Sequence, residues 1–132
     1  MSRREYPTVA FILTLIGGIL GLIVALMYFA LALGALFIAT GAARPPELPM
    51  IGHAGAWVAG VCGWFLIAQI IILIGAFKIK SGIPETVRTW GIIVLIFSII
   101  GGGNLLSLIG GILALVWKPP KPVEAPPPPP PT

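Results

Sequence analysis

The sequence predicts an all-α, polytopic membrane helical bundle of four spans, with two long helices, a short C-terminal hairpin and a disordered proline-rich tail. Three observations predict this fold: apolar residues make up 58% of the 132 residues, charged residues make up only 9%, and the mean hydropathy is +1.06. A soluble domain carries about a quarter charged residues. A chain with so few charges cannot cover a water-facing surface, so lipid must surround most of it.

The first apolar segment predicts a long transmembrane helix over residues 8–40, after a cytoplasmic N-terminus of residues 1–7. Such a helix is about 50 Å long at 1.5 Å per residue. The hydrocarbon core of a bilayer is only about 30 Å thick, so the helix tilts or its outer turns project from the membrane. A signal peptide has an apolar stretch of only about 7–15 residues, and we therefore expect an uncleaved span.

The second span is predicted over residues 53–77. The segment before it, 41–52, holds three prolines and one charge of each sign, which is typical of a loop, here on the external side. The span stops at Lys78 and is followed by a cytoplasmic loop over residues 78–88.

The apolar segment 89–117 allows one span of 29 residues or two short helices that fold back at a turn over residues 101–104. Charge favours the hairpin. If the N-terminus is cytoplasmic, four spans leave seven of the eight Lys and Arg residues inside, whereas three spans leave five. Positive residues concentrate on the cytoplasmic side. Two such short helices reach only about 21–25 Å, so we expect the first two helices to enclose the turn.

The C-terminal segment, residues 118–132, is dominated by proline and is predicted to form an extended cytoplasmic tail. Proline-rich chains adopt solvated polyproline II and bind aromatic grooves at low entropic cost. A cytoplasmic partner for the tail is one interpretation, and a solvated terminus without a partner is the alternative.

Small residues at regular spacing predict where the helices touch. Lipid tails are as apolar as leucine, so membrane helices associate through close contact of small residues. The residues predicted to make these contacts are Gly17, Gly21, Ala25, Gly55, Ala59, Gly63, Ser107 and Gly111.

Gln69 and Asn104 are the polar side chains within the spans most in need of hydrogen-bond partners. A hydrogen bond between helices, worth about 0.6–2 kcal/mol, is the simpler interpretation, and the lining of a water or solute path is the alternative. Trp57 and Trp64 are seven residues apart and are predicted to face lipid or a partner protein from one side of their helix.

The basic residues beside the apolar segments predict contacts with anionic lipid headgroups. This basic rim consists of Lys78, Lys80, Arg88 and Lys118. A nucleic-acid surface needs basic residues interleaved with aromatic ones, so no nucleic-acid partner is predicted.

Residues for catalysis are scarce. His53 and Cys62 are the only histidine and cysteine, and no acidic residue lies within the spans. One imidazole without further ligands makes no metal site. The sequence therefore predicts no enzyme, no metal and no cofactor.

Three motifs resemble a known group of proteins: the Gly-Gly-Ile-Leu segments, the Lys-Ile-Lys-Ser-Gly after the second span, and the final Gly-Gly-Ile-Leu-Ala-Leu-Val-Trp-Lys-Pro. They resemble small four-helix membrane proteins of archaea and Gram-positive bacteria, which form families of unknown function. The likeness covers most of the chain through glycine-rich packing motifs. It implies the four-span layout and carries over no catalytic residue.

The function predicted from these features is that of a structural, accessory or assembly subunit in the plasma membrane, with both termini in the cytoplasm. Its small-residue faces would dock another membrane protein or a second copy within the lipid bilayer. The alternatives are an oligomeric pore, a holin-like or small-solute transport protein, and a lipid-headgroup-binding protein.

Overall fold

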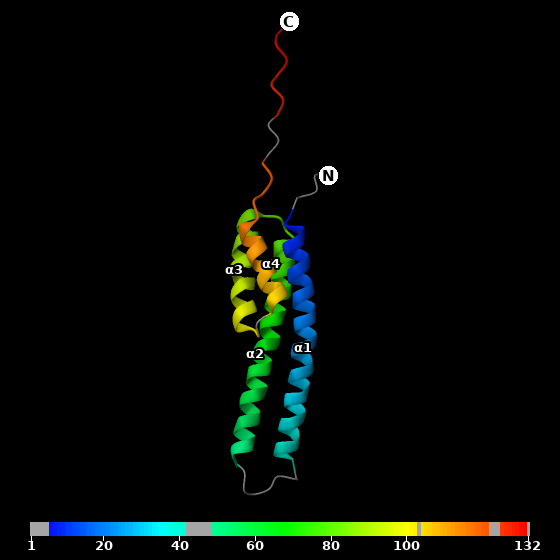
Figure 1. The fold of residues 1–132 in the computed structure, drawn as a ribbon, viewed down its shortest axis with the longest axis vertical. Coiled ribbons are helices and arrows are strands. Elements are labelled where there is room, and N and C mark those ends of the chain that lie inside the picture. The colour runs from blue at the N-terminus through cyan, green and yellow to red at the C-terminus, as the bar shows by residue number, and fades with distance from the viewer. Residues whose placement is uncertain (1–5, 42–48, 103, 122–124, 132) are drawn as a thin grey trace.

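The structure is a computed structural model, and it describes residues 6–41, 49–102, 104–121 and 125–131. Within these ranges it contains no strand and four helices, which are α1 (Thr8–Thr40), α2 (Pro49–Ile79), α3 (Pro84–Ile100) and α4 (Leu105–Val116) (Figure 1). The predicted all-helical fold is thereby confirmed. The predicted N-terminal segment and external loop lie mostly outside the described residues, as does Gly103.

The helices fall into two length classes. At 1.5 Å per residue, α1 and α2 are about 50 and 46 Å long, whereas α3 and α4 are about 25 and 18 Å long. Two stretches, Thr8–Ile38 and His53–Ile79, are long and apolar enough to cross a membrane. Only 28% and 22% of their apolar windows are buried within the chain. The core helix of a soluble protein would be mostly buried, so both helices leave apolar surface for another environment.

The helix α2 begins at Pro49, four residues before the predicted span, and ends at Ile79, two residues after it. Proline is tolerated in the first turn of a helix because the backbone N–H there has no helical partner. Proline content alone therefore does not separate the loop from the first turn of α2.

The short helices cover only half of the long pair. The hairpin of α3 and α4 packs against the N-terminal part of α1 and the C-terminal part of α2, and the other ends of α1 and α2 extend well beyond the hairpin turn (Figure 1). We call the covered part the four-helix half: α3 and α4 with residues 8–21 and 65–79. Residues 26–40 and 53–63 form the two-helix half.

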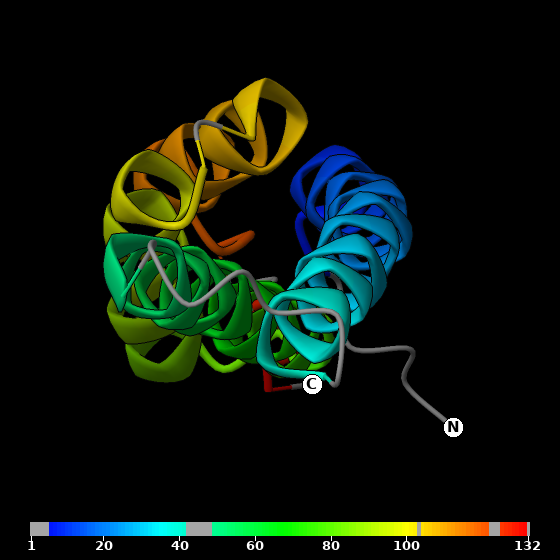
Figure 2. The ribbon, with the colours of Figure 1, turned by 90° about the horizontal axis from the view of Figure 1, so that it is seen from below.

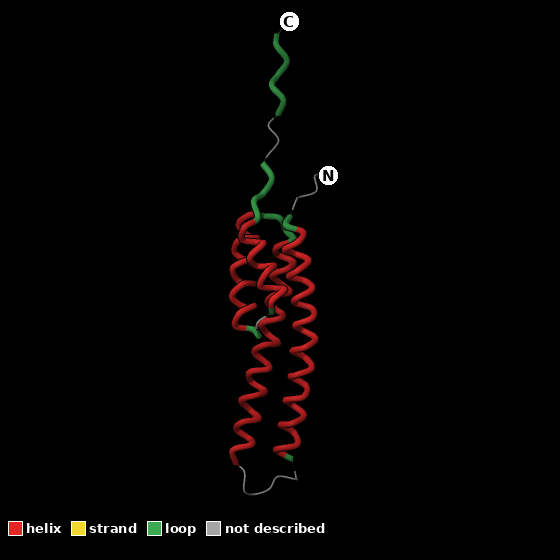
Figure 3. The backbone as a smooth tube through the Cα atoms, viewed as in Figure 1, coloured by secondary structure: helices red, strands yellow, loops and turns green. Residues whose placement is uncertain are grey.

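Within the four-helix half the helices follow one another around a ring, so that α4 closes it against α1 (Figure 2). The start of α1, the α2–α3 connection and the end of α4 all lie at the same end of the molecule (Figure 3). The α2–α3 connection is tight because Gly82 has a φ of 68° and the Ser81 hydroxyl donates to the Lys78 carbonyl at 2.6 Å. A positive φ is easily adopted by glycine.

The buried apolar core lies in the four-helix half. Its fully buried members come from all four helices and are Ala10, Ile72, Ile79, Val87, Val94 and Ala114. Larger side chains such as Phe11, Trp90 and Phe97 pack around them. These apolar contacts hold the hairpin of α3 and α4 against α1 and α2. They also fix the position of the turn between α3 and α4.

Candidate functional site

The turn between α3 and α4 places backbone polar groups beside the middle of α1 and α2. Gly102 has a φ of 107°, a conformation that L side chains rarely adopt. A Cβ atom added at Gly101 would lie 2.5 Å from the Cβ atom of Ala68 on α2. Both glycines are therefore required, Gly102 by its backbone conformation and Gly101 by close contacts with Ala68 of α2 and with the Phe97 carbonyl of α3.

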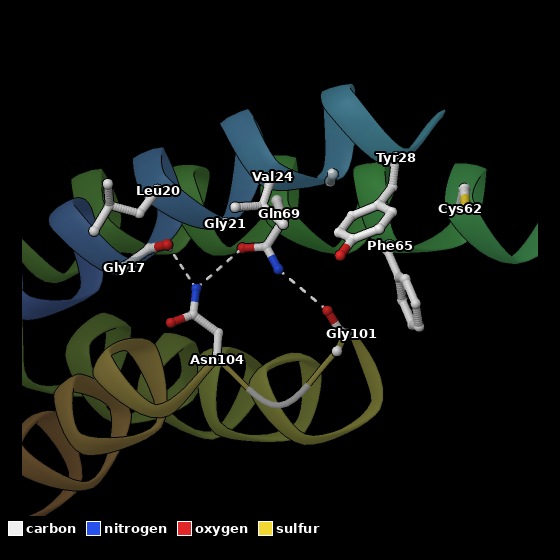
Figure 4. A pocket seen from close by; sticks show the side chains of 12 residues that line it. Gly17, Leu20, Gly21, Val24, Tyr28, Cys62, Phe65, Gln69, Gly101 and Asn104 are labelled. Carbon is white, nitrogen blue, oxygen red and sulfur yellow. Dashed lines mark hydrogen bonds between the residues drawn. The ribbon is translucent and has the colours of Figure 1, made fainter. Parts of the chain in front are cut away.

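Two side chains of α2 donate hydrogen bonds to the C-terminal end of α3. The last carbonyl groups of a helix have no partner within the helix. The Trp64 Nε1 group donates to the Ile100 carbonyl at 3.2 Å. The Gln69 Nε2 group donates to the Gly101 carbonyl at 3.1 Å (Figure 4). Because an unpaired buried carbonyl costs about 1–3 kcal/mol, the buried Gln69 bond stabilises the turn, and the Trp64 bond adds a second contact at a more exposed position.

Asn104 connects three helices from its position at the start of α4. Its Nδ2 group donates to the Gly17 carbonyl of α1 at 2.6 Å and to Gln69 Oε1 of α2 at 3.3 Å (Figure 4). Its Oδ1 atom accepts from the Ser107 N–H at 3.3 Å, which caps α4. The structure therefore brings Gln69 and Asn104, 35 residues apart, into one network with the backbone.

Glycines of α1 make room for this polar network. A Cβ atom at Gly17 would lie 2.5 Å from Ser107 Oγ, and one at Gly21 would overlap Gln69 Oε1 and lie 2.8 Å from Asn104 Nδ2. The close approach of α1 thus depends on the absence of side chains at Gly17 and Gly21.

A second close contact joins α1 and α4 further toward their outer ends. The hydroxyl groups of Thr14 and Ser107 are buried without a hydrogen-bond partner in the described residues. Each hydroxyl faces a glycine of the opposite helix, Thr14 facing Gly110 and Ser107 facing Gly17. This reciprocal pairing of a small polar residue with a glycine draws the two backbones together.

A hollow of about 410 Å³ lies next to the polar network, at the boundary between the two halves. Gln69 and Asn104 lie on its wall, and the Tyr28 ring reaches into it from α1 (Figure 4). The remaining lining residues are Gly17, Leu20, Gly21, Val24, Ala25, Cys62, Phe65, Gly101 and Gly102. The hollow is therefore apolar, with a small polar region beneath the hairpin turn.

The residues predicted for helix packing separate into two groups. In or near the four-helix half, Gly17 and Gly21 lie against the network, Ala25 and Ser107 are buried, and Gly111 lies against the Gly91 carbonyl.

In the two-helix half the predicted packing contacts are looser and involve only α1 and α2. A Cβ atom at Gly55 would lie 3.2 Å from Leu36, and one at Gly63 would lie 3.6 Å from Phe29. Ala59 is half-buried.

Sequence reasoning missed three glycines that the structure places in contacts between helices. Gly18 lies against Leu73, Gly75 against Val94, and Gly91 against Ala114. Gly75 and Gly91 are single glycines without a small neighbour four residues away on the same face, so a spacing rule does not detect them. A glycine inside a helix costs about 1 kcal/mol relative to alanine. This cost was the one indication in the sequence that Gly75 and Gly91 lie against another helix.

Both tryptophans of α2 are exposed and lie on one face of the helix, as the seven-residue spacing predicts, but their contacts differ. Trp57 is 77% exposed, whereas the Trp64 ring lies 6.0 Å from the Phe97 ring in addition to its hydrogen bond. The α3 helix, whose position sequence spacing does not reveal, contacts Trp64 and leaves it 43% exposed.

The basic rim lies at the end of the molecule that carries the start of α1 and the end of α4 (Figure 1). Its members Lys78, Lys80, Arg88 and Lys118 are all exposed. The Lys80 ammonium group lies 5.4 Å from the centre of the Phe11 ring, a cation–π arrangement. In the described part of the chain, no three His, Cys, Asp or Glu residues form a group that could hold a metal ion.

No protein-family model, no curated protein and no solved structure matches this chain. The resemblance to small four-helix membrane proteins therefore stays a prediction. Function has to be inferred from the geometry of the chain itself.

Proposed function

We propose that this protein is a multi-pass plasma-membrane protein that acts as a structural or assembly subunit. Its two-helix half docks a transmembrane helix of another membrane protein, and its proline-rich tail contacts a cytoplasmic partner. The observation that carries the proposal is the unequal covering of α1 and α2, which have two further helices beside them in one half and none in the other (Figure 1).

Helix length and the placement of charge support the membrane location. The helices α1 and α2 exceed the hydrocarbon thickness of about 30 Å, while α3 and α4 are shorter than it. In the proposed topology the long helices cross fully and the hairpin enters from the cytoplasmic side and turns within the bilayer. Irregular backbone at that depth must be enclosed by protein, and Trp64 and Gln69 bind the carbonyl groups of the turn.

Small residues on the two-helix half support helix docking. A Cβ atom at Gly34 or Gly60 would meet no atom within 4 Å. A shallow groove on α2 surrounds Gly60 and is lined by Ala56, Trp57, Val61 and Trp64. Since small residues let helix backbones approach closely in lipid, this groove fits a transmembrane helix.

The geometry of the proline-rich tail supports a contact with a cytoplasmic partner. Its described residues, 118–121 and 125–131, are exposed and extend away from the bundle (Figure 1). An extended proline-rich chain is already in the conformation that aromatic grooves bind. It lies at the basic end of the molecule, which is cytoplasmic in the proposed topology.

The pore alternative gains no specific support. A conducting path needs a stripe of polar groups along the spans. Gln69 and Asn104 instead each donate to a backbone carbonyl, and Asn104 Nδ2 also donates to Gln69 Oε1.

The groove on α2 can be tested with a matched pair of variants in the native membrane. Gly60→Leu fills the groove, whereas Val58→Leu enlarges an exposed side chain two residues away, on another face of α2. We expect crosslinking and purification in mild detergent to recover a defined membrane partner with wild type and Val58→Leu, and to lose it with Gly60→Leu at unchanged thermal stability. Equal recovery with both variants, or ion conduction by the purified protein in liposomes, would contradict the proposal.

Removal of residues 118–132 tests the tail separately. We expect the truncated protein to keep its membrane partner and to lose a soluble partner in the same crosslinking experiment. If recovery of both kinds of partner is unchanged, the tail has no docking role.

A further inference from the structure

The hollow beneath the hairpin turn combines an apolar wall with unused hydrogen-bonding groups. The Tyr28 side chain is 62% exposed and points into the hollow, and its hydroxyl has no partner within the described residues (Figure 4). Gln69 is 4% exposed and uses one of its two amide N–H groups for the Gly101 carbonyl. Within the described part of the chain, the second N–H and the phenol hydroxyl therefore have no partner, and both can bind a guest.

The lining of the hollow selects against charge. It contains no carboxylate, ammonium, guanidinium or imidazole group. Burying a charge without a partner is costly in an apolar environment, and a charged group within a bilayer is costly as well. A guest that reaches the polar region must therefore be neutral there.

The shape of the hollow suits a guest with an apolar body. Leu20, Val24 and Phe65 line the hollow beside the polar region, and the two-helix half continues from it as an apolar surface. A volume of about 410 Å³ falls in the range of about 300–1,000 Å³ that is usual for small-molecule sites.

We propose that this hollow binds a neutral lipid with a single hydroxyl or carbonyl head, such as a long-chain alcohol. The head accepts a hydrogen bond from the free N–H of Gln69 and bonds to the Tyr28 hydroxyl. The hydrocarbon chain lies against Val24 and Phe65 and continues along the two-helix half. This binding site is independent of the proposed subunit role, because the groove around Gly60 shares no lining residue with it.

The test uses the full-length protein in phosphatidylcholine nanodiscs and a hexadecanol that carries a photoreactive diazirine. Illumination attaches the probe to nearby residues, which mass spectrometry identifies. We expect labelling at Tyr28, Cys62 and Phe65, and we expect unlabelled hexadecanol to suppress it. Hexadecane, which lacks the head, should compete at least about three- to tenfold less well, the effect of losing one hydrogen bond. Palmitate should also compete less well, because its charged carboxylate would be buried without a counter-ion.

Two variants with matched controls locate the site. Tyr28→Phe removes only the hydroxyl and should lower labelling about three- to tenfold, whereas Tyr6→Phe, outside the hollow, should leave it unchanged. Val24→Trp fills the hollow and should abolish labelling. Val58→Trp makes the same change at an exposed site outside the hollow and should leave labelling unchanged.

The result that would overturn the proposal is labelling that hexadecane or palmitate suppresses as well as hexadecanol does, since the head would then not be recognised. Labelling that Tyr28→Phe leaves unchanged would overturn it as well. So would an absence of labelling in the hollow of the wild type. None of these results bears on the loss of a partner in Gly60→Leu, so the two proposals fail separately.

Discussion

The four-helix half and the two-helix half use the same residue types for different purposes. In the four-helix half, glycines such as Gly17 and Gly110 face backbone and hydroxyl groups of another helix at distances that allow no side chain. In the two-helix half, Gly34 and Gly60 face open space. The difference shows that a glycine in an apolar helix indicates close helix packing only where another helix lies against it. Where no neighbour is present, it marks a place that a partner can occupy.

Polar side chains show the same contrast. The hydrogen-bonding residues Gln69 and Ser107, which are buried, and Asn104, which is half-buried, all lie in the four-helix half. Exposed apolar side chains occur in both halves, for example Phe37 and Trp57 in the two-helix half and Phe77 and Leu105 in the four-helix half. The two halves therefore differ in their internal polar contacts, while both present apolar surface.

The largest effect on stability is expected for Gly110→Ala. The added Cβ atom would overlap Thr14 Oγ1 and lie 2.9 Å from the Thr14 backbone nitrogen, so α1 must move. We expect a loss of about 1–3 kcal/mol in the free energy of unfolding, the usual cost of overpacking. Unfolding by denaturing detergent, followed by circular dichroism, measures it.

Gly34→Ala is the matched control in the two-helix half. Its Cβ atom meets nothing within 4 Å, and alanine favours a helix over glycine by up to about 1 kcal/mol. A loss for Gly34→Ala equal to that for Gly110→Ala would remove the distinction between the halves.

A somewhat smaller effect is expected for Gln69→Leu. The substitution removes the side-chain donor to the Gly101 carbonyl and one of the two acceptors of Asn104 Nδ2, which keeps its bond to the Gly17 carbonyl. We expect a loss of about 1–2 kcal/mol, measured by the same unfolding experiment. Because Asn104→Leu disrupts the same network, the double variant should lose less than the sum of the two single losses. Strict additivity would show that the bond between the two amides adds no stability.

Trp64→Phe should cost about 0.5–1.5 kcal/mol, since it removes one hydrogen bond to the Ile100 carbonyl and keeps an aromatic ring beside Phe97. Trp57→Phe is the control in the two-helix half and should leave the free energy of unfolding unchanged. Hydrogen exchange at the turn should also accelerate in Trp64→Phe and not in Trp57→Phe. Equal exchange rates would mean that Trp64 does not support the turn.

The smallest effect on the isolated protein is expected for Lys80→Gln. Lys80 is exposed, and its ammonium group contacts the Phe11 ring, an interaction worth about 0.5–1 kcal/mol at exposed sites. Lys78→Gln, for which no ring contact occurs within the described residues, is the control with the same loss of charge. If Lys80→Gln and Lys78→Gln lower the free energy of unfolding equally, the loss comes from the positive charge that both remove and not from the contact with Phe11.

Much of the fold follows from local sequence. Apolar segments of different lengths predict helices of different lengths, and the glycines followed by Asn104 predict the break between α3 and α4, where Gly102 has a positive φ. Glycine spacing indicated Gly17, Gly21 and Gly111, which the structure places at close contacts. The partners of these residues could not be predicted, because spacing along one helix does not specify which helix lies opposite.

The sequence by itself determined the helical character of the chain, its apolar surface and the approximate lengths of its helices. These properties follow from hydropathy, proline and glycine, which act within a few residues along the chain. Only the tertiary structure decided that α2 binds the end of α3 through Trp64 and Gln69, that Asn104 contacts α1, and that the hairpin leaves half of the long pair uncovered. The physical reason is that these contacts join residues 32 to 87 positions apart. Such contacts depend on helix rotation and crossing, which the complete set of packing contacts determines together.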